Sequence, residues 1–140
     1  MPAKDYSHRD AVDKLGIQPG YGIVFIDDAW PLDEALRRRV LDRADRAAVE
    51  PKHTNDAVDV VLVTVDDTTA AVAVLARWRS CIQAAGAIWL LSPKRGQPGY
   101  VDQRTLIDAG PSARMVDNKS CAVSETVSGL RFVIRRMDRV

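Results

Sequence analysis

The sequence predicts a small three-layer αβα fold, a Rossmann-like sheet that is mostly parallel and ends in an antiparallel hairpin. Short runs of β-branched and other apolar residues recur at 22–26, 57–65 and 87–91, as in strands that are buried on both faces. Segments with helical periodicity separate these runs, which implies parallel pairing through right-handed crossovers. The last apolar segment, 130–136, alternates apolar and polar residues, which is typical of a strand with one exposed face.

The size and charge of the chain narrow the classes of protein. Its 140 residues suit one domain that needs neither disulfide nor metal to fold. The 20 basic and 19 acidic residues argue against binding nucleic acid or a membrane through bulk charge. The polar residues 1–10 indicate no signal peptide, and the longest apolar run, 70–76, is too short to span a bilayer. We expect a cytoplasmic protein with a loose arm at residues 1–8 and with reduced thiols at Cys81 and Cys121.

The first strand follows a short helix and a tight turn. The helix is expected over residues 9–15, with Gly16 as its left-handed stop. Residues 18–21 read Gln-Pro-Gly-Tyr, and Pro followed by Gly at the two central positions is what a type II turn requires. Strand 22–26 then begins.

Three further helices are expected. Residues 32–46 carry an apolar residue at every fourth position, which gives one buried stripe. Residues 66–85 have a second apolar face, with acidic caps at the start and Gly86 as the stop. A weaker helix is expected over 101–109 and is broken by residues 110–112. The buried stripe of the helix expected at residues 32–46 comprises Leu32, Leu36, Val40 and Ala44.

The end of the chain is predicted to form the hairpin. Its two strands are residues 115–123 and 130–136, with Ser128 and Gly129 in the turn. A very short strand is also expected at residues 48–50.

Several segments resemble an actinobacterial family, the domain of unknown function 3052. They are LGIQPG, VDVVLV, GAIWLLSPK and VDNKSCAV, followed by SGLRFVIRR. The resemblance extends over residues 15–136 and is most specific near the C-terminus. It implies a truncated Rossmann or methyltransferase-like sheet and brings no activity, substrate or catalytic residue. The family commonly has an aromatic residue before the SG pair, where this chain has Val127.

Candidate ligand-binding residues follow the three predicted parallel strands. Ligands of open α/β sheets bind at the carboxyl ends of such strands. Because Lys94, Arg95 and Tyr100 come after the third strand, they favour a small anionic ligand. The candidates are Asp27, Asp28 and Trp30 after the first strand, Thr64 and Asp66 at the second, and Ser92, Lys94, Arg95 and Tyr100 at the third.

The loop after the first strand argues against a cofactor. Dinucleotide and S-adenosylmethionine sites need glycines there, so that the backbone can approach the ligand closely. This loop reads DDAWPLDE, and Trp30 and Pro31 occupy the glycine positions. We therefore predict no cofactor. A loop that folds across the strand ends, with Trp30 in the pocket, would exclude cofactor-dependent catalysis.

A receiver-like phosphoacceptor domain is an alternative. Asp27, Asp28, Asp66 and Lys94 resemble the acidic pair, the further aspartate and the lysine of such domains, and carboxylates of this kind bind Mg²⁺. Two features argue against it. The chain ends in a hairpin instead of further parallel strands, and Pro93 precedes the lysine where receivers have a proline after it.

The sequence gives little support for a metal site or a catalytic cysteine. Cys81, Cys121, His8 and His53 show no zinc-ligand spacing, so no metal site is predicted. Cys121 lies on a predicted strand without a base beside it in the sequence, and buried cysteines usually act as small apolar residues. No catalytic residue is assigned.

Basic residues gather near the C-terminus. Arg131, Arg135 and Arg136, with Lys119 across the hairpin, are the candidate partner-binding residues. One interpretation is that these charges protect a sheet edge from aggregation. The other is that they form a docking edge for an acidic protein or a homodimer contact.

The sequence favours a non-catalytic Rossmann-like module that binds a partner protein or a small anionic ligand at the carboxyl ends of its strands. The alternative is a diverged transferase dependent on S-adenosylmethionine or a nucleotide. Asp27, Asp28 and Lys94 are the residues that such a transferase would use.

Overall fold

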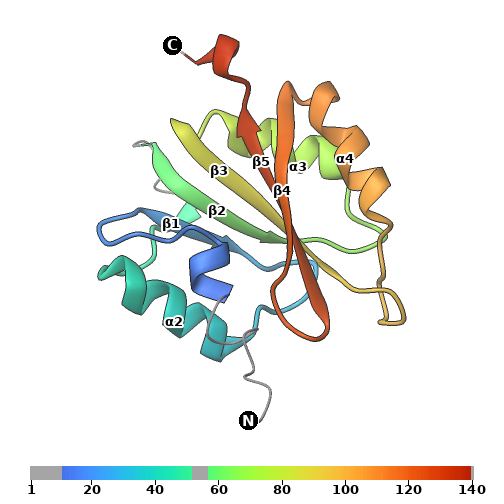
Figure 1. Ribbon diagram of the computed structural model, residues 1–140, viewed down its shortest axis with the longest axis horizontal. Helices are drawn as coiled ribbons and strands as arrows, with labels where there is room; N and C mark the ends of the chain where they lie inside the picture. The colour runs from blue at the N-terminus through green and yellow to red at the C-terminus, as the bar shows by residue number, and fades with distance from the viewer. Residues whose placement is uncertain (1–10, 52–56, 140) are drawn as a thin grey trace, which may run out of the picture.

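The computed structural model describes residues 11–51 and 57–139 and shows a five-stranded sheet between layers of helices (Figure 1). The strand order is β1-β2-β3-β5-β4. The first three strands are parallel, and β5 is antiparallel to both of its neighbours. The elements are β1 (Ile23–Ile26), α2 (Glu34–Ala44), β2 (Val58–Thr64), α3 (Ala71–Arg79), β3 (Ile82–Pro93), α4 (Gln103–Ser112), β4 (Met115–Ala122), β5 (Val127–Ile134) and the 3-10 turn η2 (Arg136–Asp138).

The sheet has an apolar core on each face. Successive residues of a strand point to opposite faces, so Val24 of β1 packs toward α3 and α4, whereas Ile23 and Phe25 pack toward α2 and residues 11–17. The predicted three-layer α/β fold is therefore confirmed. All four residues of the predicted stripe are buried: Leu32, which lies just before α2, and Leu36, Val40 and Ala44 within it.

The segment through α2 covers the face of the sheet opposite to the one that α3 and α4 cover. The Val49 amide bonds the Ile23 carbonyl oxygen at 2.8 Å, so the chain returns from α2 along the outer edge of β1.

The turn before β1 forms as predicted. Residues 11–14 are helical, and the Ile17 amide donates to the Val12 carbonyl oxygen at 3.3 Å beyond Gly16. Gly20 has a φ of +90°, and the Tyr21 amide donates to the Gln18 carbonyl oxygen at 3.2 Å, as in a type II turn. The Trp89 indole donates to the Leu15 carbonyl oxygen at 3.2 Å, which joins this segment to the middle of the sheet. The predicted arm at 1–8 lies outside the described residues.

The helix that was predicted to end near residue 85 is too long at its C-terminal end. α3 begins at Ala71 and ends at Arg79, and the chain enters β3 at Ile82, which pairs with Val58. The register shifts before the pairing of Val60 with Ala87, as at a β-bulge. Gly86 lies in this irregular part, where a Cβ would come within 2.9 Å of the Asp59 carbonyl oxygen. Gly86 thus permits a close backbone approach and does not end a helix.

The predicted turn of the hairpin is also wrong. Ser128 and Gly129 lie within β5, and the turn occupies residues 124–126 instead. A Cβ on Gly129 would come within 3.0 Å of the Trp89 ring, so this glycine lets β5 approach the indole. β5 lies between β3 and β4, so β4 is the edge strand of the hairpin.

Two smaller expectations also differ. α4 continues through residues 110–112, and the Ala113 amide donates to the Ala109 and Gly110 carbonyl oxygens in its last turn. Residues 48–50 form no strand, although Val49 makes its single bond to β1. Within the described ranges, no helix is long and apolar enough to cross a membrane.

Candidate functional site

The loop after β1 folds back across the carboxyl end of β2. The Trp30 indole Nε1 donates to the Val65 carbonyl oxygen at 2.8 Å. The buried Thr64 hydroxyl donates to the Trp30 carbonyl oxygen at 2.8 Å, and the Trp30 amide lies 3.5 Å from the same hydroxyl. Trp30 is therefore fixed by both its backbone and its side chain.

Two acidic residues hold the rest of this loop. The Asp27 carboxylate accepts from the Leu32 amide at 3.3 Å. Asp33 is the N-cap of α2 and accepts from the Leu36 amide at 3.1 Å, which satisfies one of the free donors of the first helical turn. Both carboxylates thus stabilise the loop itself.

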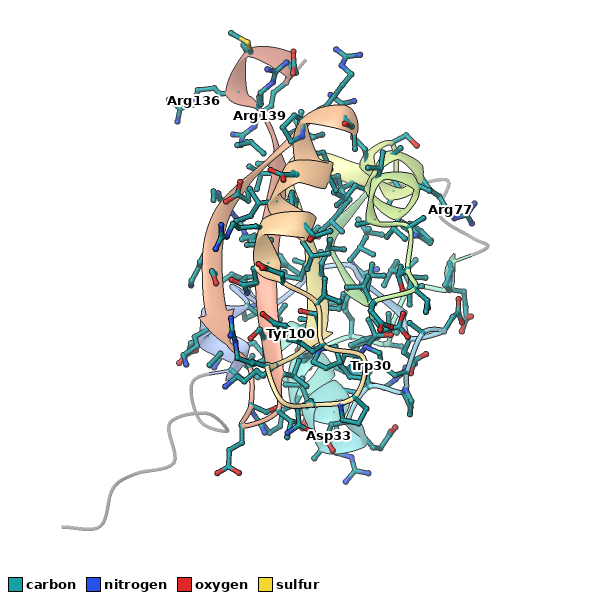
Figure 2. All side chains as sticks on the ribbon, turned by 90° about the vertical axis from the view of Figure 1, so that its right-hand side faces the viewer. Trp30, Asp33, Arg77, Tyr100, Arg136 and Arg139 are labelled. Atoms are coloured by element: carbon teal, nitrogen blue, oxygen red, sulfur yellow. The ribbon has the colours of Figure 1, made fainter. Side chains whose placement is uncertain are left out.

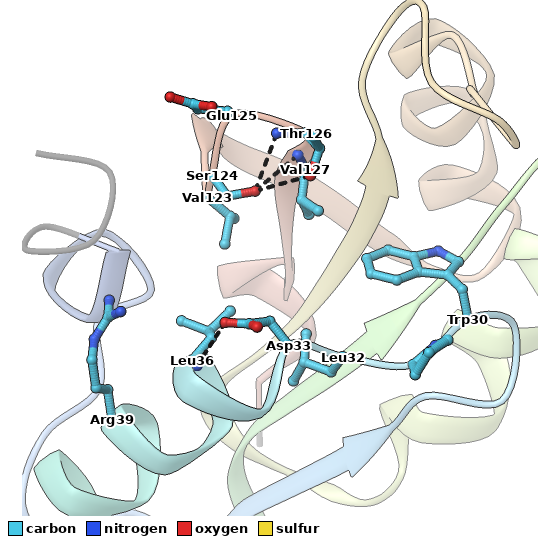
Figure 3. A pocket seen from close by; sticks show the side chains of 11 residues that line it. Trp30, Leu32, Asp33, Leu36, Arg39, Val123, Ser124, Glu125, Thr126 and Val127 are labelled. Carbon is cyan, nitrogen blue, oxygen red and sulfur yellow. Dashed lines mark hydrogen bonds between the residues drawn. The ribbon is translucent and has the colours of Figure 1, made fainter. Parts of the chain in front are cut away.

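A pocket of about 640 Å³, the first pocket, lies between this loop and the β4–β5 turn (Figure 3). Its lining is apolar at Leu32, Leu36 and Val123, and the Trp30 indole forms one wall. The full lining is Trp30, Pro31, Leu32, Asp33, Leu36, Arg39, Val123, Ser124, Glu125, Thr126 and Val127.

A second pocket of about 530 Å³ lies beside the loop that follows β3. Trp30, Thr126 and Val127 line both pockets, so the indole is a wall that the two share. The second pocket is lined by Trp30, Asp66, Asp67, Pro93, Gln97, Pro98, Gly99, Thr126 and Val127.

The β4–β5 turn is the part of the site that sequence reasoning missed. The Ser124 hydroxyl accepts from the amides of Thr126 and Val127 at 3.2 and 3.1 Å. The Lys94 amide donates to the Thr126 carbonyl oxygen at 2.9 Å, which ties the turn to the end of β3. A serine that bonds amides two and three residues on is a local turn signal, whereas the strand order that brings the turn to this edge has no local signal.

Carboxylates dominate the charge of both pockets. Asp33, Glu125 and Arg39 are the charged residues that line the first pocket, and Asp66 and Asp67 line the second without a basic residue. The pKa of Asp66 lies below its ordinary value, first because the Thr68 hydroxyl and amide donate to its carboxylate at 2.6 and 2.9 Å. This carboxylate closes its own turn and does not cap α3, which begins after Ala70 without a side-chain cap.

The structure separates the other candidate ligand residues from the two pockets. Ser92 is buried in β3, and Asp28 lies with Asp27 beside α3 in a different hollow. The Arg95 guanidinium stacks over the Tyr100 ring at 5.6 Å. Lys94, Arg95 and Tyr100 line neither pocket.

The candidate partner residues fall into two places. Lys119 and Arg131 pair across the hairpin, where Lys119 donates to the Lys14 carbonyl oxygen at 2.9 Å and Arg131 to the Asn118 amide oxygen at 3.1 Å. Arg135 and Arg136 lie beyond β5. The pKa of Arg131 is lowered, chiefly by burial, whereas Tyr21 raises it and Arg139 lowers it further.

The thiols and histidines form no recognisable centre. Both cysteines are partly buried. Burial raises the pKa of the Cys121 thiol, while Lys119 and Lys14 act to lower it. No three acidic, histidine or cysteine side chains in residues 11–51 and 57–139 are grouped to hold a metal ion. His8 and His53 lie outside those ranges.

The fold is that of Rossmann-like methyltransferases. A methyltransferase from Aquifex aeolicus that depends on S-adenosylmethionine matches 91% of this chain over 89% of its own, with a TM-score of 0.61 and 6% identity. A methyltransferase from Pyrococcus furiosus matches 94% of this chain over 83% of its own length, with a TM-score of 0.56 and 12% identity. An O-methyltransferase of neocarzinostatin biosynthesis, solved with S-adenosyl-L-homocysteine, matches 81% with a TM-score of 0.52 and 17% identity, but this chain spans only 42% of that enzyme.

The chain itself belongs to the family of proteins of unknown function DUF3052, whose model matches residues 12–136. This confirms the resemblance that the sequence suggested. A comparison with curated proteins gave no match. Fold and family are therefore established, and the activity must be argued from the site.

Proposed function

We propose that the protein is a non-catalytic binding module that holds a small, partly apolar, uncharged or cationic molecule in the first pocket. The observation that carries this proposal is the fixed position of Trp30, which is bonded to the end of β2 and forms a wall of the pocket. Aromatic faces attract apolar groups and cations. A side chain that is already fixed loses little conformational entropy when a ligand binds.

The charge of the lining supports a ligand without negative charge. Asp33 and Glu125 outnumber Arg39 in the first pocket, so an anion there would be opposed by two carboxylates. The anionic ligand expected from the sequence depended on Lys94 and Arg95, which line neither pocket. The proposal therefore replaces the anion with an uncharged or cationic molecule.

The loop after β1 supports binding without group transfer. Cofactor sites of this fold class bring the ligand against glycine backbone at the end of the first strand. In this protein a tryptophan occupies that loop, and its bond to the Val65 carbonyl oxygen holds it across the strand ends. A methyltransferase is the second candidate, which the fold of the structural neighbours favours.

A matched set of probes tests the proposal. Benzyltrimethylammonium, benzyl alcohol and benzyl phosphate share one benzyl group and carry a cationic, an uncharged and an anionic head group, so calorimetric titration compares ligands of different charge. We expect the cation to bind most tightly, the alcohol next and the phosphate least, because of the carboxylates in the lining. The reverse order would contradict the proposal and restore the anionic ligand.

Variants locate the binding. Glu125→Gln removes a carboxylate of the first pocket. It should lower the affinity for benzyltrimethylammonium several-fold and leave the affinity for benzyl alcohol unchanged. Glu50→Gln removes an exposed carboxylate that lines neither pocket and should change neither affinity. Equal effects of the two variants would show that the cation binds through general charge and not in the first pocket.

A further inference from the structure

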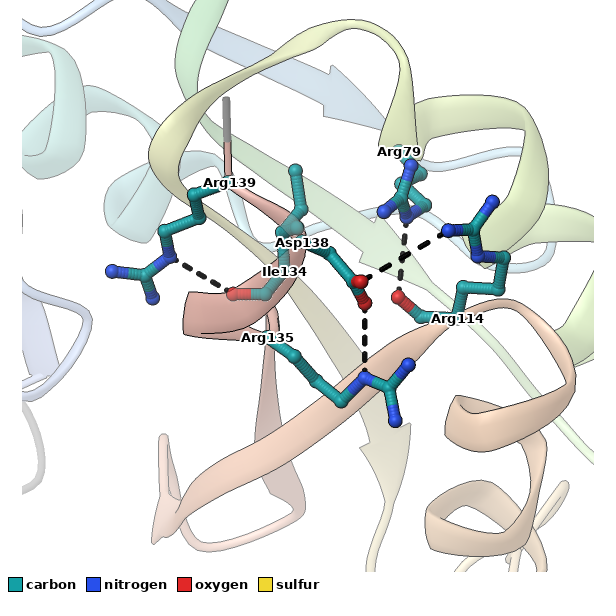
Figure 4. Close-up of polar contacts among 6 residues, drawn as sticks. All are labelled: Arg79, Arg114, Ile134, Arg135, Asp138 and Arg139. Atoms are coloured by element: carbon teal, nitrogen blue, oxygen red, sulfur yellow. Dashed lines mark hydrogen bonds and ion pairs between the residues drawn. The ribbon is translucent and has the colours of Figure 1, made fainter.

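Five arginine side chains gather at one end of the molecule, and Figure 4 shows all of them except Arg136, which is labelled in Figure 2. We call this group the arginine pole. Figure 2 shows Arg136 and Arg139 at one end and Trp30, Asp33 and Tyr100 at the other. The group comes from the end of α3, the turn between α4 and β4, the end of β5 and η2: Arg79, Arg114, Arg135, Arg136 and Arg139.

The positive charge of the pole is poorly balanced. Among the described residues, Asp138 provides the carboxylate that lies within ion-pair distance of the pole. It is 3.0 Å from Arg135 and 4.0 Å from Arg114. Its side chain is only 16% exposed, whereas those of Arg114 and Arg135 are 69% and 51% exposed. The Arg136 side chain is exposed and makes no hydrogen bond or ion pair within the part of the chain that the structure describes.

Two guanidinium groups are held in place through Nε, which leaves their terminal nitrogens available. Arg79 Nε donates to the Arg114 carbonyl oxygen at 3.1 Å, and Arg139 Nε donates to the Ile134 carbonyl oxygen at 3.0 Å. The two terminal nitrogens of each group form the flat fork that binds a carboxylate with two parallel hydrogen bonds. The pole is therefore preorganised for carboxylates.

Protection of a sheet edge does not account for the pole. Charges protect a sheet when they lie on an edge strand, but β5 is flanked by β3 and β4, so Arg135 and Arg136 do not follow an edge strand. Arg114 has a φ of +61°, a conformation that glycine adopts without strain. An arginine at this position adds charge to a crowded cluster at a cost in backbone energy.

An apolar side chain lies among these charges. Met137 of η2 is 81% exposed and stands between Arg136 and Asp138 in the chain. Methionine and arginine are both enriched in protein interfaces. We propose that the arginine pole docks an acidic segment of a partner protein, with Met137 contacting an apolar side chain of that segment.

An acidic protein segment fits the pole better than nucleic acid does. A phosphate backbone offers no apolar partner for Met137, and it extends beyond a small patch over the rest of the surface. That surface carries little net positive charge, since the whole chain has a net charge of +1 and the far pockets are acidic. Nucleic-acid binding generally requires a basic stripe that follows many phosphates.

Fluorescence anisotropy with a defined probe tests the proposal. The probe is a labelled twelve-residue peptide of alternating Glu and Asp with one central Leu, titrated with the full chain in dilute salt. Arg114→Gly with Arg136→Gln should weaken binding tenfold or more and leave Tm unchanged or higher, because glycine relieves the backbone at position 114. The control, Arg38→Gln with Arg104→Gln, removes the same charge from exposed positions outside the pole and should weaken binding less than twofold.

The contribution of Met137 is measured by a double comparison. Met137→Ser should weaken binding of the peptide with the central Leu and leave binding of a peptide with a central Ser unchanged. An equal loss of peptide affinity in the two double arginine variants, or no saturable peptide binding, would overturn the proposal. Tighter binding of a twelve-nucleotide single strand through the same arginines would assign the pole to nucleic acid. Self-association that Arg114→Gly abolishes, without peptide binding, would assign it to a second copy of the chain.

Discussion

The indole nitrogen of Trp30 donates a hydrogen bond to the carbonyl oxygen of Val65 at 2.8 Å, and this bond holds the loop after β1 against the end of β2. The contact matters because ligands of open α/β sheets bind at this edge. It makes the indole part of the protein wall on which both pockets depend. The same bond therefore supports the fold of the loop and the proposed binding surface.

Thr64→Val should lower the free energy of unfolding by about 1–3 kcal/mol, because it leaves the Trp30 carbonyl oxygen without its donor in a part-buried place. Thr64→Ser keeps the hydroxyl and should cost less. Urea denaturation measures both. Equal stability of the valine variant and the wild-type protein would mean that the loop is not held by this bond.

Gly86→Ala should lower the free energy of unfolding by about 1–3 kcal/mol, because the new methyl group would lie 2.9 Å from the Asp59 carbonyl oxygen and backbone would have to move. Gly22→Ala is the matched control, since its methyl group would meet only side-chain carbons at 3.6 Å. Thermal denaturation of the two variants compares them. A larger loss for Gly22→Ala would contradict the bulge at the start of β3.

The acid titration of Asp66 should depend on Thr68. The lowered pKa of Asp66 means that the fold stabilises its ionised form. This contribution is present above the ordinary pKa of the carboxyl group and is lost as the pH falls through the lowered value. Thr68→Val removes the hydroxyl donor and should raise the midpoint of the carboxyl NMR titration, whereas Thr68→Ser should leave it low. A midpoint that the valine does not move would exclude the hydroxyl as the cause.

The Cys121 thiol should ionise at higher pH than an ordinary cysteine, because burial raises its pKa. Lys119 opposes this effect, so Lys119→Gln should raise the pKa further. The pH dependence of iodoacetamide alkylation in a Cys81→Ser background gives the pKa separately from the access of the reagent. Lys94→Gln serves as the control. A lower pKa in the Lys119 variant would contradict the assigned electrostatic effect.

Local patterns were sufficient to predict the strands and the first turn. Runs such as residues 57–65 and 87–91 are buried in the sheet because their residues are apolar and β-branched. Gly20 adopts the positive φ that its place after Pro19 predicts. The order of the strands could not be predicted, because β5 inserts between β3 and β4 through contacts far apart in the sequence.

The incorrect predictions also have their cause in contacts between residues that are far apart in the sequence. Ile82 continues the helical spacing of Leu75 and Trp78, but its pairing with Val58 places it in β3. Gly129 was assigned to a turn by its residue type, whereas the close approach of the Trp89 ring is what requires it. Trp30, one of the predicted ligand-binding residues, lines the first pocket, whereas the β4–β5 turn on its other side was not among the predicted residues.

We propose that Trp30 lines a binding site that does not use S-adenosylmethionine. The most direct measurement is the indole Nε1–H signal of Trp30 in a ¹H–¹⁵N spectrum, assigned with Trp30→Phe, during separate titrations with benzyltrimethylammonium and S-adenosylmethionine. We predict a saturable shift of this signal with the first compound, and none with the second. A saturable shift with S-adenosylmethionine alone would contradict the account and favour a methyltransferase.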